Sequence, residues 1–347
     1  MASSPRVAVI VVNYNGGSIV ERCVEALGEQ TLAPHRVIVV DNASTDGSPD
    51  AIAARFPEVE LVRLDENVGF AAANNLAARR ADDCDWLALL NPDAFPEPRW
   101  LEELVRAADE NPDYTFFASR LVRANAPELD GTGDVYHVSG MAWRRDEGEP
   151  ATAVRAADEV FSACAAAALY RRDVFLAAGG FDASFFCYYE DTDLAFRLRL
   201  AGHRCLYVPD AIVRHVGFGS SGELSEFTIY HSHRNSVWTY ARNMPSPLLW
   251  VYLPQHLLVN AVDVASAALR GRAAAAGRAK RDAVCGLPRV LAERRRLQRA
   301  RVVGAWELRR QMARGLEPYR VGIQRRLALL RAERHGRGTS PLRNPVS

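Results

Sequence analysis

The sequence predicts an α/β protein built on a doubly wound, mostly parallel sheet. Four apolar runs, at 7–12, 36–40, 60–64 and 86–90, alternate with segments that have helical spacing. Continuous runs rich in Val, Ile and Leu are typical of strands that are buried on both faces. The order strand–helix–strand therefore repeats through the first 90 residues, as in an open parallel sheet covered by helices.

Local signals indicate where the helices between these strands begin. Ser18 and Glu21 have the spacing of a capping box, which predicts a helix that ends near Glu29. Ser48-Pro49 supplies an N-cap followed by a proline at the first helical position. An Ala-rich helix is expected after the third strand and a further helix at 100–110.

The second half of the chain is less regular. Strands are expected at 114–121 and 135–143, with a loop at 124–134 between them. The small-residue segment 160–170 fits a buried strand or a buried helix, and periodicity does not separate the two. After 188–189 a helix is expected, capped by Asp193 and ended at Gly202, followed by a short strand at 205–208.

Polar residues stand directly after the four parallel strands. They are Asn13, Asp41, Asn67 and Asp93. One such residue is commonly a helix cap, but four in succession favour a ligand site, because open α/β sheets bind ligands at the carboxyl ends of their strands. The sequence has neither the G-x-G-x-x-G fingerprint of dinucleotide binding after the first strand nor a P-loop.

Charge is divided unevenly along the chain. From Arg270 onward there are 21 Lys and Arg against 5 Asp and Glu, and the preceding residues carry 22 against 37. An acidic body is therefore joined to a basic C-terminal part. The six cysteines form no C-x-x-C pair, and the first apolar run is too short for a signal peptide. We expect reduced thiols and a cytoplasmic location.

Residues 248–269 form a long apolar segment interrupted by polar residues. His256, Asn260 and Asp263 fall on one stripe, opposite Leu253 and Leu257. A charge in the middle of a membrane-spanning helix costs about 2.5–3.5 kcal/mol, so we expect an amphipathic helix that does not span. Packing on the rest of the protein and lying in a membrane interface both fit this pattern.

Arginine-rich segments follow at 294–301, 309–314 and 325–334. Basic side chains gain about 1 kcal/mol each near an anionic leaflet. We therefore expect residues 244–347 to be a helical basic extension that attaches a domain of residues 1–243 to the inner face of the plasma membrane. Nucleic-acid binding is not expected, because no recognition motif accompanies the charge.

Several ordered motifs between residues 7 and 235, about two-thirds of the chain, carry a family resemblance. They read VVNYN, VVDNASTDGS, ENVGFAAANN, LLNPDAF and GGFDASFFCYYEDTDLAFRLRLAGHRCLYVP, followed by RH. In these motifs the chain resembles the family-2 glycosyltransferases with the GT-A fold, in particular the bacterial rhamnosyltransferase-like branch that builds cell-wall and surface polysaccharides.

The resemblance implies a nucleotide-diphosphate sugar donor, dTDP- or UDP-linked, and an inverting transfer to a hydroxyl group. Rhamnose is the branch-level expectation for the sugar, and a cell-envelope glycan or a polyprenyl-diphosphate-linked sugar is the expected acceptor. A divalent cation, Mg²⁺ or Mn²⁺, would neutralise the leaving diphosphate. The family's Asp-x-Asp reads Asn91-Pro92-Asp93 here, so Asp93 would bind the metal. His215 matches the family's later histidine and would be a further metal ligand or a diphosphate contact.

The same matching gives roles to other residues. Asp191 would be the general base that takes the acceptor proton, with Glu190 holding its neighbour or the acceptor. The donor side is expected to comprise Asn13, Tyr14, Asn15, Asp41, Asn67, Gly69, Asn91, Asp93 and Arg234. The Q-x-x-R-W block of processive members reads His231-Ser232-His233-Arg234-Asn235, without Trp, which favours a single transfer.

Two other classes of protein stay open at this point. A nucleotidyltransferase would normally carry an Arg- or Lys-containing glycine-rich loop after the first strand, and NYNGGS contains neither residue. A non-catalytic protein that binds nucleotide sugars would not need Asp93, Asp191 and His215 to be intact.

Overall fold

The computed structural model describes residues 5–217 and 225–315, and it confirms the predicted fold class. Its main sheet has ten strands, with the order β10-β12-β6-β11-β4-β1-β2-β3; β5 pairs with β12, and β7 with β6. The first strands are β1 (Val7–Asn13), β2 (Arg36–Asp41), β3 (Glu60–Arg63), β4 (Trp86–Leu90) and β5 (Ala94–Pro96). The segment β3-β2-β1-β4 is parallel throughout, as the sequence predicts.

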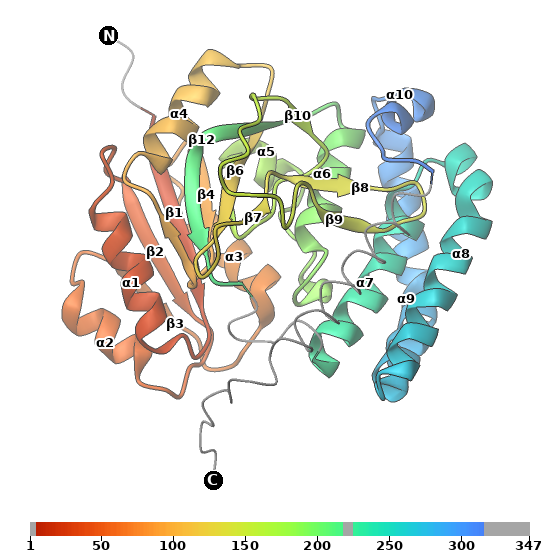
Figure 1. Ribbon diagram of the computed structural model, residues 1–347, viewed down its shortest axis with the longest axis horizontal. Coiled ribbons are helices and arrows are strands. Elements are labelled where there is room, and N and C mark those ends of the chain that lie inside the picture. The colour runs from red at the N-terminus through yellow and green to blue at the C-terminus, as the bar shows by residue number, and fades with distance from the viewer. Residues whose placement is uncertain (1–4, 218–224, 316–347) are drawn as a thin grey trace. The chain divides into compact units, whose positions relative to one another are not determined.

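Helices cover both faces of this sheet (Figure 1). They are α1 (Gly17–Gly28), α2 (Ser48–Arg55), α3 (Gly69–Arg80), α4 (Trp100–Glu110), α5 (Arg172–Ala177) and α6 (Glu190–Leu200). Along β1 the even-numbered side chains pack with α3 and α6, and the odd-numbered ones with α1 and α4. This two-sided burial explains why β1 contains no polar residue before Asn13.

The other half of the sheet mixes directions. It consists of β6 (Phe116–Arg123), β7 (Leu129–Gly131), β10 (Glu159–Val160), β11 (Ala167–Arg171) and β12 (Cys205–His215). β11 is antiparallel to both β4 and β6. The predicted strand at 205–208 was too short, because β12 resumes pairing with β6 after a register shift between Val208 and Ile212 and continues to His215.

Three other local predictions were wrong. The expected strand at 135–143 is a hairpin of β8 (Asp134–Tyr136) and β9 (Ala142–Arg144), and the expected loop at 124–134 contains β7. The capping box at Ser18 does not form, because α1 begins at Gly17 and the Asn13 side-chain oxygen accepts the N–H of Gly16 instead. The segment 160–170, which fitted either a strand or a helix, contains no helix: β10 ends at its start and β11 occupies its end.

Four helices end the described part of the chain: α7 (Glu226–Asn243), α8 (Ser246–Leu269), α9 (Ala273–Ala300) and α10 (Ala305–Arg310). α9 packs along α7, and α8 packs on α9 (Figure 1). The described residues up to Met312 form one compact unit. The predicted boundary at residue 243 stays a prediction, and the arginine-rich segment 325–334 lies outside the described residues.

Contrary to the sequence prediction, Asp193 does not cap α6; through Arg242 it links α6 to α7 and α9. It lies inside the helix, fully buried, and accepts hydrogen bonds from Arg197 Nε at 2.8 Å and Arg242 Nε at 3.0 Å. Arg242, on α7, also bonds Glu293 of α9 at 2.7 Å. Burial alone would raise the pKa of Asp193, but the two guanidinium groups hold it below its usual value of 3.8.

We predict that Asp193→Ala destabilises the fold by about 3–5 kcal/mol, because it leaves Arg197 and Arg242 buried without their shared anion. The contribution of Asp193 is full above about pH 4 and declines as pH falls toward its lowered pKa in the folded state. Urea unfolding at pH 7 measures the change. Asp109→Ala, at an exposed position on α4, is the control and should change stability by less than about 0.5 kcal/mol.

Candidate active site

The end of β1 organises the nucleotide side of the predicted site. Asn13 is fully buried, and its amide nitrogen donates to Asp41 Oδ1 at 2.9 Å and to Ser48 Oγ at 2.8 Å. Asp41 Oδ2 accepts the backbone N–H of Ser44 at 3.1 Å. Asn13 therefore orients Asp41 at the edge of the sheet, as the parallel register between β1 and β2 requires.

Tyr14 and Asn15 continue this edge into a loop. Asn15 has a left-handed backbone with φ 51°, and its side chain accepts the N–H of Thr45 at 2.8 Å. The Tyr14 side chain is 45% exposed beside this loop, which is high for a tyrosine so close to a buried strand. Its ring is accessible to a planar ligand, whereas Asn15 serves to fix the loop.

The turn between β3 and α3 faces a different segment. Asn67 accepts the N–H of Gly69 at 2.9 Å, and Gly69 has φ +85°. A Cβ at Gly69 would lie 2.6 Å from Phe186 Cδ2 and 2.8 Å from the Phe186 carbonyl oxygen. That carbonyl accepts the N–H of Ala71 at 3.1 Å, so Gly69 allows residues 186–189 to approach the start of α3.

The register of the sheet brings Asp93 and His215 together. His215 pairs with Ala94 across β12 and β5, and Asp93 Oδ1 lies 3.4 Å from His215 Nε2. On the other side of the ring, His215 Nδ1 bonds Asp130 Oδ2 at 2.7 Å. Burial alone would lower the pKa of His215, but the two carboxylates raise it above 6.5.

This pair fits a divalent cation. His215 is 2% exposed, and its Nε2 has no hydrogen-bond partner within normal distance among the described residues. Two ligand atoms about 2.1 Å from one cation lie about 3 Å apart, close to the spacing seen here. When Asp130 accepts a hydrogen from Nδ1, the lone pair of Nε2 points toward Asp93, the arrangement common around metal-ligating histidines.

Arg144 connects this pair to the other carboxylates. It lies on β9 and forms an ion pair with Asp130. It also lowers the pKa of Asp191, which burial raises, so its charge reaches both parts of the site. Ligating atoms of Asp134, Cys164 and Asp191 lie within 4.8 Å of one another. Burial, and next the charge of Asp191, raises the pKa of Asp134 well above 3.8.

Asp191 is held next to the end of β4 by backbone hydrogen bonds. Its Oδ2 accepts the N–H of Ala165 at 3.1 Å, and Oδ1 accepts the N–H of Thr192 at 2.7 Å. The adjacent Ala166 carbonyl accepts the N–H of Asn91 at 2.9 Å. These bonds place Asp191 beside the segment that contains Asn91 and Asp93. Burial raises the pKa of Asp191 despite the two N–H groups and Arg144.

Glu190 is more deeply buried than Asp191. It begins α6, is 5% exposed, and its Oε2 has no hydrogen-bond partner among the described residues. Burial, followed by the neighbouring Asp191, raises its pKa well above 4.5. A carboxyl group in this state holds a proton at a higher pH than an exposed glutamate does.

The turn before these carboxylates has an unusual backbone. Phe186, Tyr188 and Tyr189 all have positive φ, between 65° and 68°. The buried amide of Asn235, on α7, donates to the carbonyls of Phe185, Cys187 and Tyr188 at 3.0, 3.0 and 2.7 Å. These contacts offset a conformation that costs about 1–3 kcal/mol for each such residue.

Arg234 lies next to Asn235 and supports the same turn. Its guanidinium donates to the carbonyls of Ser184 at 2.9 Å and Phe185 at 3.0 Å, and lies 4.5 Å from the Trp238 ring centre. These contacts give Arg234 a structural role. The donor-side role expected from the sequence stays a prediction.

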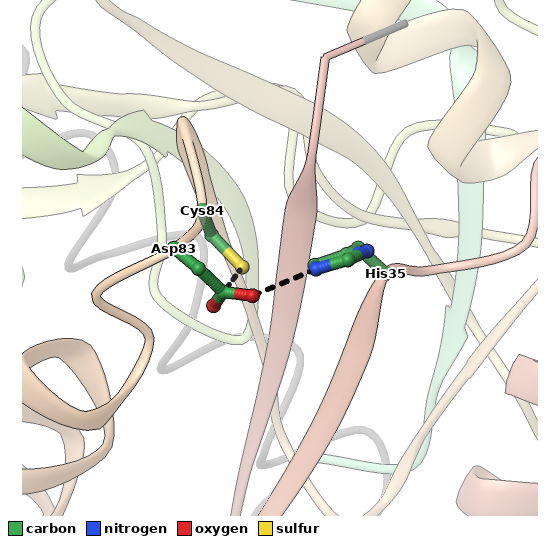
Figure 2. Close-up of side chains that lie close together, drawn as sticks. All are labelled: His35, Asp83 and Cys84. Atoms are coloured by element: carbon green, nitrogen blue, oxygen red, sulfur yellow. Dashed lines mark hydrogen bonds and ion pairs between the residues drawn. The ribbon is translucent and has the colours of Figure 1, made fainter.

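A second group of possible metal ligands lies elsewhere. Figure 2 shows His35, Asp83 and Cys84, which come from the loops that precede β2 and β4. His35 Nε2 bonds Asp83 Oδ2 at 2.8 Å, and Arg36 bonds the other oxygen at 3.1 Å. Burial raises the pKa of the Cys84 thiol to about 11. A nearby guanidinium and a protonated thiol both disfavour a cation, so this group is an ordinary hydrogen-bonded cluster.

Sequence reasoning missed Asp130, Asp134, Arg144 and Asn235. The first two lie in the run Asp130-Gly131-Thr132-Gly133-Asp134, for which the sequence predicts a loop. Two acidic residues around two glycines could have marked this run as part of a site. Arg144 gave no such signal, because its contact with Asp130 depends on the pairing of β6 with β7 and of β8 with β9.

Comparisons with known proteins identify the family to which this chain belongs. Residues 8–177 match the family described as "Glycosyl transferase family 2". An N-acetylglucosaminyl-diphospho-decaprenol L-rhamnosyltransferase of Mycobacterium tuberculosis is 30% identical over 292 residues, 72% of this chain and 92% of that protein. An O-antigen biosynthesis protein of Myxococcus xanthus is 31% identical over 214 residues, 58% of this chain and 16% of that protein.

Solved structures show the same fold. A mannosyltransferase of Pyrobaculum calidifontis, solved with GDP-Man and Mn²⁺, superposes with a TM-score of 0.51 at 22% identity and covers 86% of both chains. GalNAc-T7, solved with UDP, GalNAc and Mn²⁺, superposes with a TM-score of 0.57 at 16% identity over 70% of this chain and 48% of that one. The chain belongs to glycosyltransferase family 2 and is a rhamnosyltransferase-like glycosyltransferase with a GT-A fold.

We predict that Gly69→Ala lowers the free energy of unfolding by roughly 1–3 kcal/mol and slows sugar transfer, because the new Cβ displaces Phe186 and strains the turn. Thermal unfolding and turnover measure the two effects. Gly28→Ala is the matched control: it lies at the end of α1 with open space around its Cβ position, so unchanged or slightly higher stability is expected. Equal behaviour of the two variants would contradict the packing argument.

Proposed function

We propose that this enzyme moves a sugar, with inversion, from a nucleoside-diphosphate donor to a hydroxyl group of a cell-envelope glycan or a polyprenyl-diphosphate-linked acceptor. The single observation that carries the proposal is the shared edge of Asp93, His215 and Asp191. Backbone bonds through Ala165, Ala166 and Asn91 join the two carboxylate positions. At such an edge, Asp93 and His215 can serve the charged leaving group while Asp191 takes the proton of the acceptor.

Asp93 and His215 would hold a divalent cation, Mg²⁺ or Mn²⁺, and Asp130 would orient the histidine ring. The cation supplies positive charge to the departing diphosphate. Two solved structures of this fold contain Mn²⁺, which supports a divalent cation. Asn91 stands where the family usually has an acid, so Asp93 would be the single carboxylate of this motif that binds the metal.

Asp191 would accept the proton of the attacking hydroxyl. Two backbone N–H groups fix the orientation of its carboxylate, and partial burial makes it a stronger base than an exposed aspartate. Glu190, with its raised pKa, would hold a proton and position Asp191 or the acceptor.

The donor nucleotide would lie along the ends of β1 and β2. Asp41, oriented by Asn13, would accept the N3–H of a uracil or thymine base, and the exposed ring of Tyr14 would pack on that base. Asn15, Asn67 and Gly69 would shape the loops around the nucleotide and the sugar, with Arg234 near the diphosphate.

Rhamnose carried by dTDP is the proposed donor sugar. The name of the mycobacterial relative supports rhamnose as the transferred sugar and a lipid-linked diphospho-sugar as the acceptor. An acceptor of this kind is anchored in a membrane, which supports a cytoplasmic enzyme held on the inner face of the plasma membrane.

We predict that Asp191→Asn lowers kcat by about 10²–10⁴-fold while the donor affinity changes little, because an amide cannot take the proton. The kcat/KM of the wild-type enzyme should fall as the solution becomes more acidic, with its acid limb above the usual aspartate value of 3.8, because burial raises the pKa of Asp191. Initial rates across pH and donor titration by calorimetry measure these effects.

Asp173→Asn, an exposed carboxylate on α5, is the control for Asp191→Asn and should keep wild-type turnover. Wild-type turnover by Asp191→Asn, or an acid limb at or below pH 3.8, would contradict the role given to Asp191.

A donor panel tests the substrate class and the cation together. Among dTDP-rhamnose, UDP-glucose, UDP-galactose and GDP-mannose, we expect dTDP-rhamnose to be transferred fastest in Mn²⁺ or Mg²⁺. Chelation with EDTA should abolish transfer, and added Mn²⁺ should restore it. Turnover that survives chelation would contradict the metal assignment, and a strong preference for GDP-mannose would contradict the proposed role of Asp41.

A further inference from the structure

The helix α8 turns its polar residues toward the protein, together with buried apolar residues such as Val259, and leaves an apolar side exposed. An ordinary surface helix exposes its polar side instead. His256 is 5% exposed, stacks on Tyr240 with ring centres 3.9 Å apart, and bonds the Ser139 carbonyl at 2.7 Å. Asn260 bonds Lys280 of α9. The same lysine opposes the effect of burial on Asp263, whose pKa rises to about 6.

The outward side of α8 is an apolar face, because every fully exposed residue from 250 to 269 is apolar. Its exposed members recur at helical spacing: Trp250, Val251, Pro254, Leu257, Leu258, Ala261, Val262, Ala265, Ala268 and Leu269. Trp250 is 68% exposed and Leu269 80%. In Figure 1, α8 lies on the outer side of the helical region, with α9 between it and α7. The stripe of polar residues expected from the sequence is therefore present, but it faces the protein.

Charge around this face is strongly cationic. Residues 244–312 contain thirteen Lys and Arg against four Asp and Glu. Three of the acids already face cations within the protein: Asp263 lies near Lys280, Asp282 bonds Arg281, and Glu293 bonds Arg242 and Arg289. The outward charge of this region is thus almost entirely that of arginines.

Arginines lie at both ends of the apolar face. Arg270 and Arg272 follow the last turn of α8. At the other end, Arg294 of α9 bonds Ser246 at 3.1 Å, which places the end of α9 beside the start of α8. That end of α9 has an open hollow of about 650 Å³ lined by Arg295, Arg296 and Arg299.

Aromatic residues complete the pattern. α10 packs against the start of α8, where Leu308 and Met312 join Leu249 and Leu253 in one apolar cluster. Trp306 of α10 is 57% exposed, and the Arg309 guanidinium lies 5.7 Å from its ring centre. Tryptophan beside arginine is typical of the boundary between lipid chains and headgroups.

From these contacts we propose that the apolar face of α8 inserts into the interfacial region of a membrane rich in anionic lipids, with the flanking arginines on the headgroups. A second copy of this chain fits less well, because either direction of helix pairing would bring arginine-bearing ends against each other. A membrane-spanning position, which the length and hydropathy of α8 would allow, would break the bonds of His256 and Asn260 to the protein.

This surface is connected to the acceptor side of the site, a link that rests on the proposed function. His256 packs against Gly140, where a Cβ would lie 2.8 Å from the histidine Nδ1. Gly140 lies in the β8–β9 hairpin, and the N–H of Ala142 in that hairpin bonds the Tyr189 hydroxyl at 3.2 Å. Tyr189 directly precedes Glu190 and Asp191, so a lipid-bound α8 would set the height of these carboxylates above the membrane.

The test uses full-length protein and vesicles of phosphatidylglycerol and phosphatidylethanolamine, with flotation as the measurement. The variant Leu258→Gln with Val262→Gln removes apolar surface without changing charge, at positions 54% and 50% exposed. Partitioning should weaken by about tenfold or more, as expected when two inserted aliphatic side chains become amides. Val154→Gln, an exposed apolar position outside the helical region, should partition like the wild type.

Vesicle binding by the double variant equal to that of the wild type would overturn the proposal, as would a wild type that does not bind. A change in oligomeric mass by light scattering, with vesicle binding unchanged, would assign the face to a second copy instead. The flotation readout does not require sugar transfer, so a failure of the proposed function and a failure of this inference are distinguishable. Transfer to a short soluble acceptor should be unchanged in the double variant.

Discussion

The buried amide of Asn235 is the contact on which the turn before Glu190 and Asp191, the proposed acceptor side, depends. Three carbonyls of one turn accept hydrogen bonds from it, and that turn contains three left-handed residues other than glycine. Such a backbone persists only where its surroundings hold it in place. The helix that carries Asn235 is in turn held by α9 and by the Asp193–Arg242 ion pair. The C-terminal helices are therefore structural parts of the site.

Charges in the site form a connected series rather than isolated pairs. Asp93 faces His215, His215 bonds Asp130, and Asp130 pairs with Arg144. Arg144 then acts on Asp191 and Asp134. In a partly buried series of this kind, removal of one charge changes the pKa of several neighbours. Effects of substitutions along the series should consequently be non-additive.

The parallel half of the sheet and its edge were predictable from the sequence, because buried strands read as continuous apolar runs and their ends as polar residues. Asn13, Asp41 and Asp93 lie at this edge for that reason. The placement of His215 was harder to predict from the sequence, since it depends on a register shift within β12. Asp130 and Arg144 were not predictable, because short strands and a hairpin bring them in from a segment of weak periodicity. Likewise, the sequence predicts the polar stripe of α8, but not that it faces the protein, because that orientation depends on contacts with Ser139 and Lys280.

The attachment of α7 to the turn at 185–189 affects the order in which parts of the enzyme fold during synthesis. The strands β1 to β4 are contiguous in the sequence, so the nucleotide edge can assemble while the chain is still being synthesised. Asn235 and the helix that supports it emerge from the ribosome much later. The turn at 185–189 is then completed last, and a nascent chain released before α9 would carry the parallel half of the sheet without a stable turn before Glu190 and Asp191.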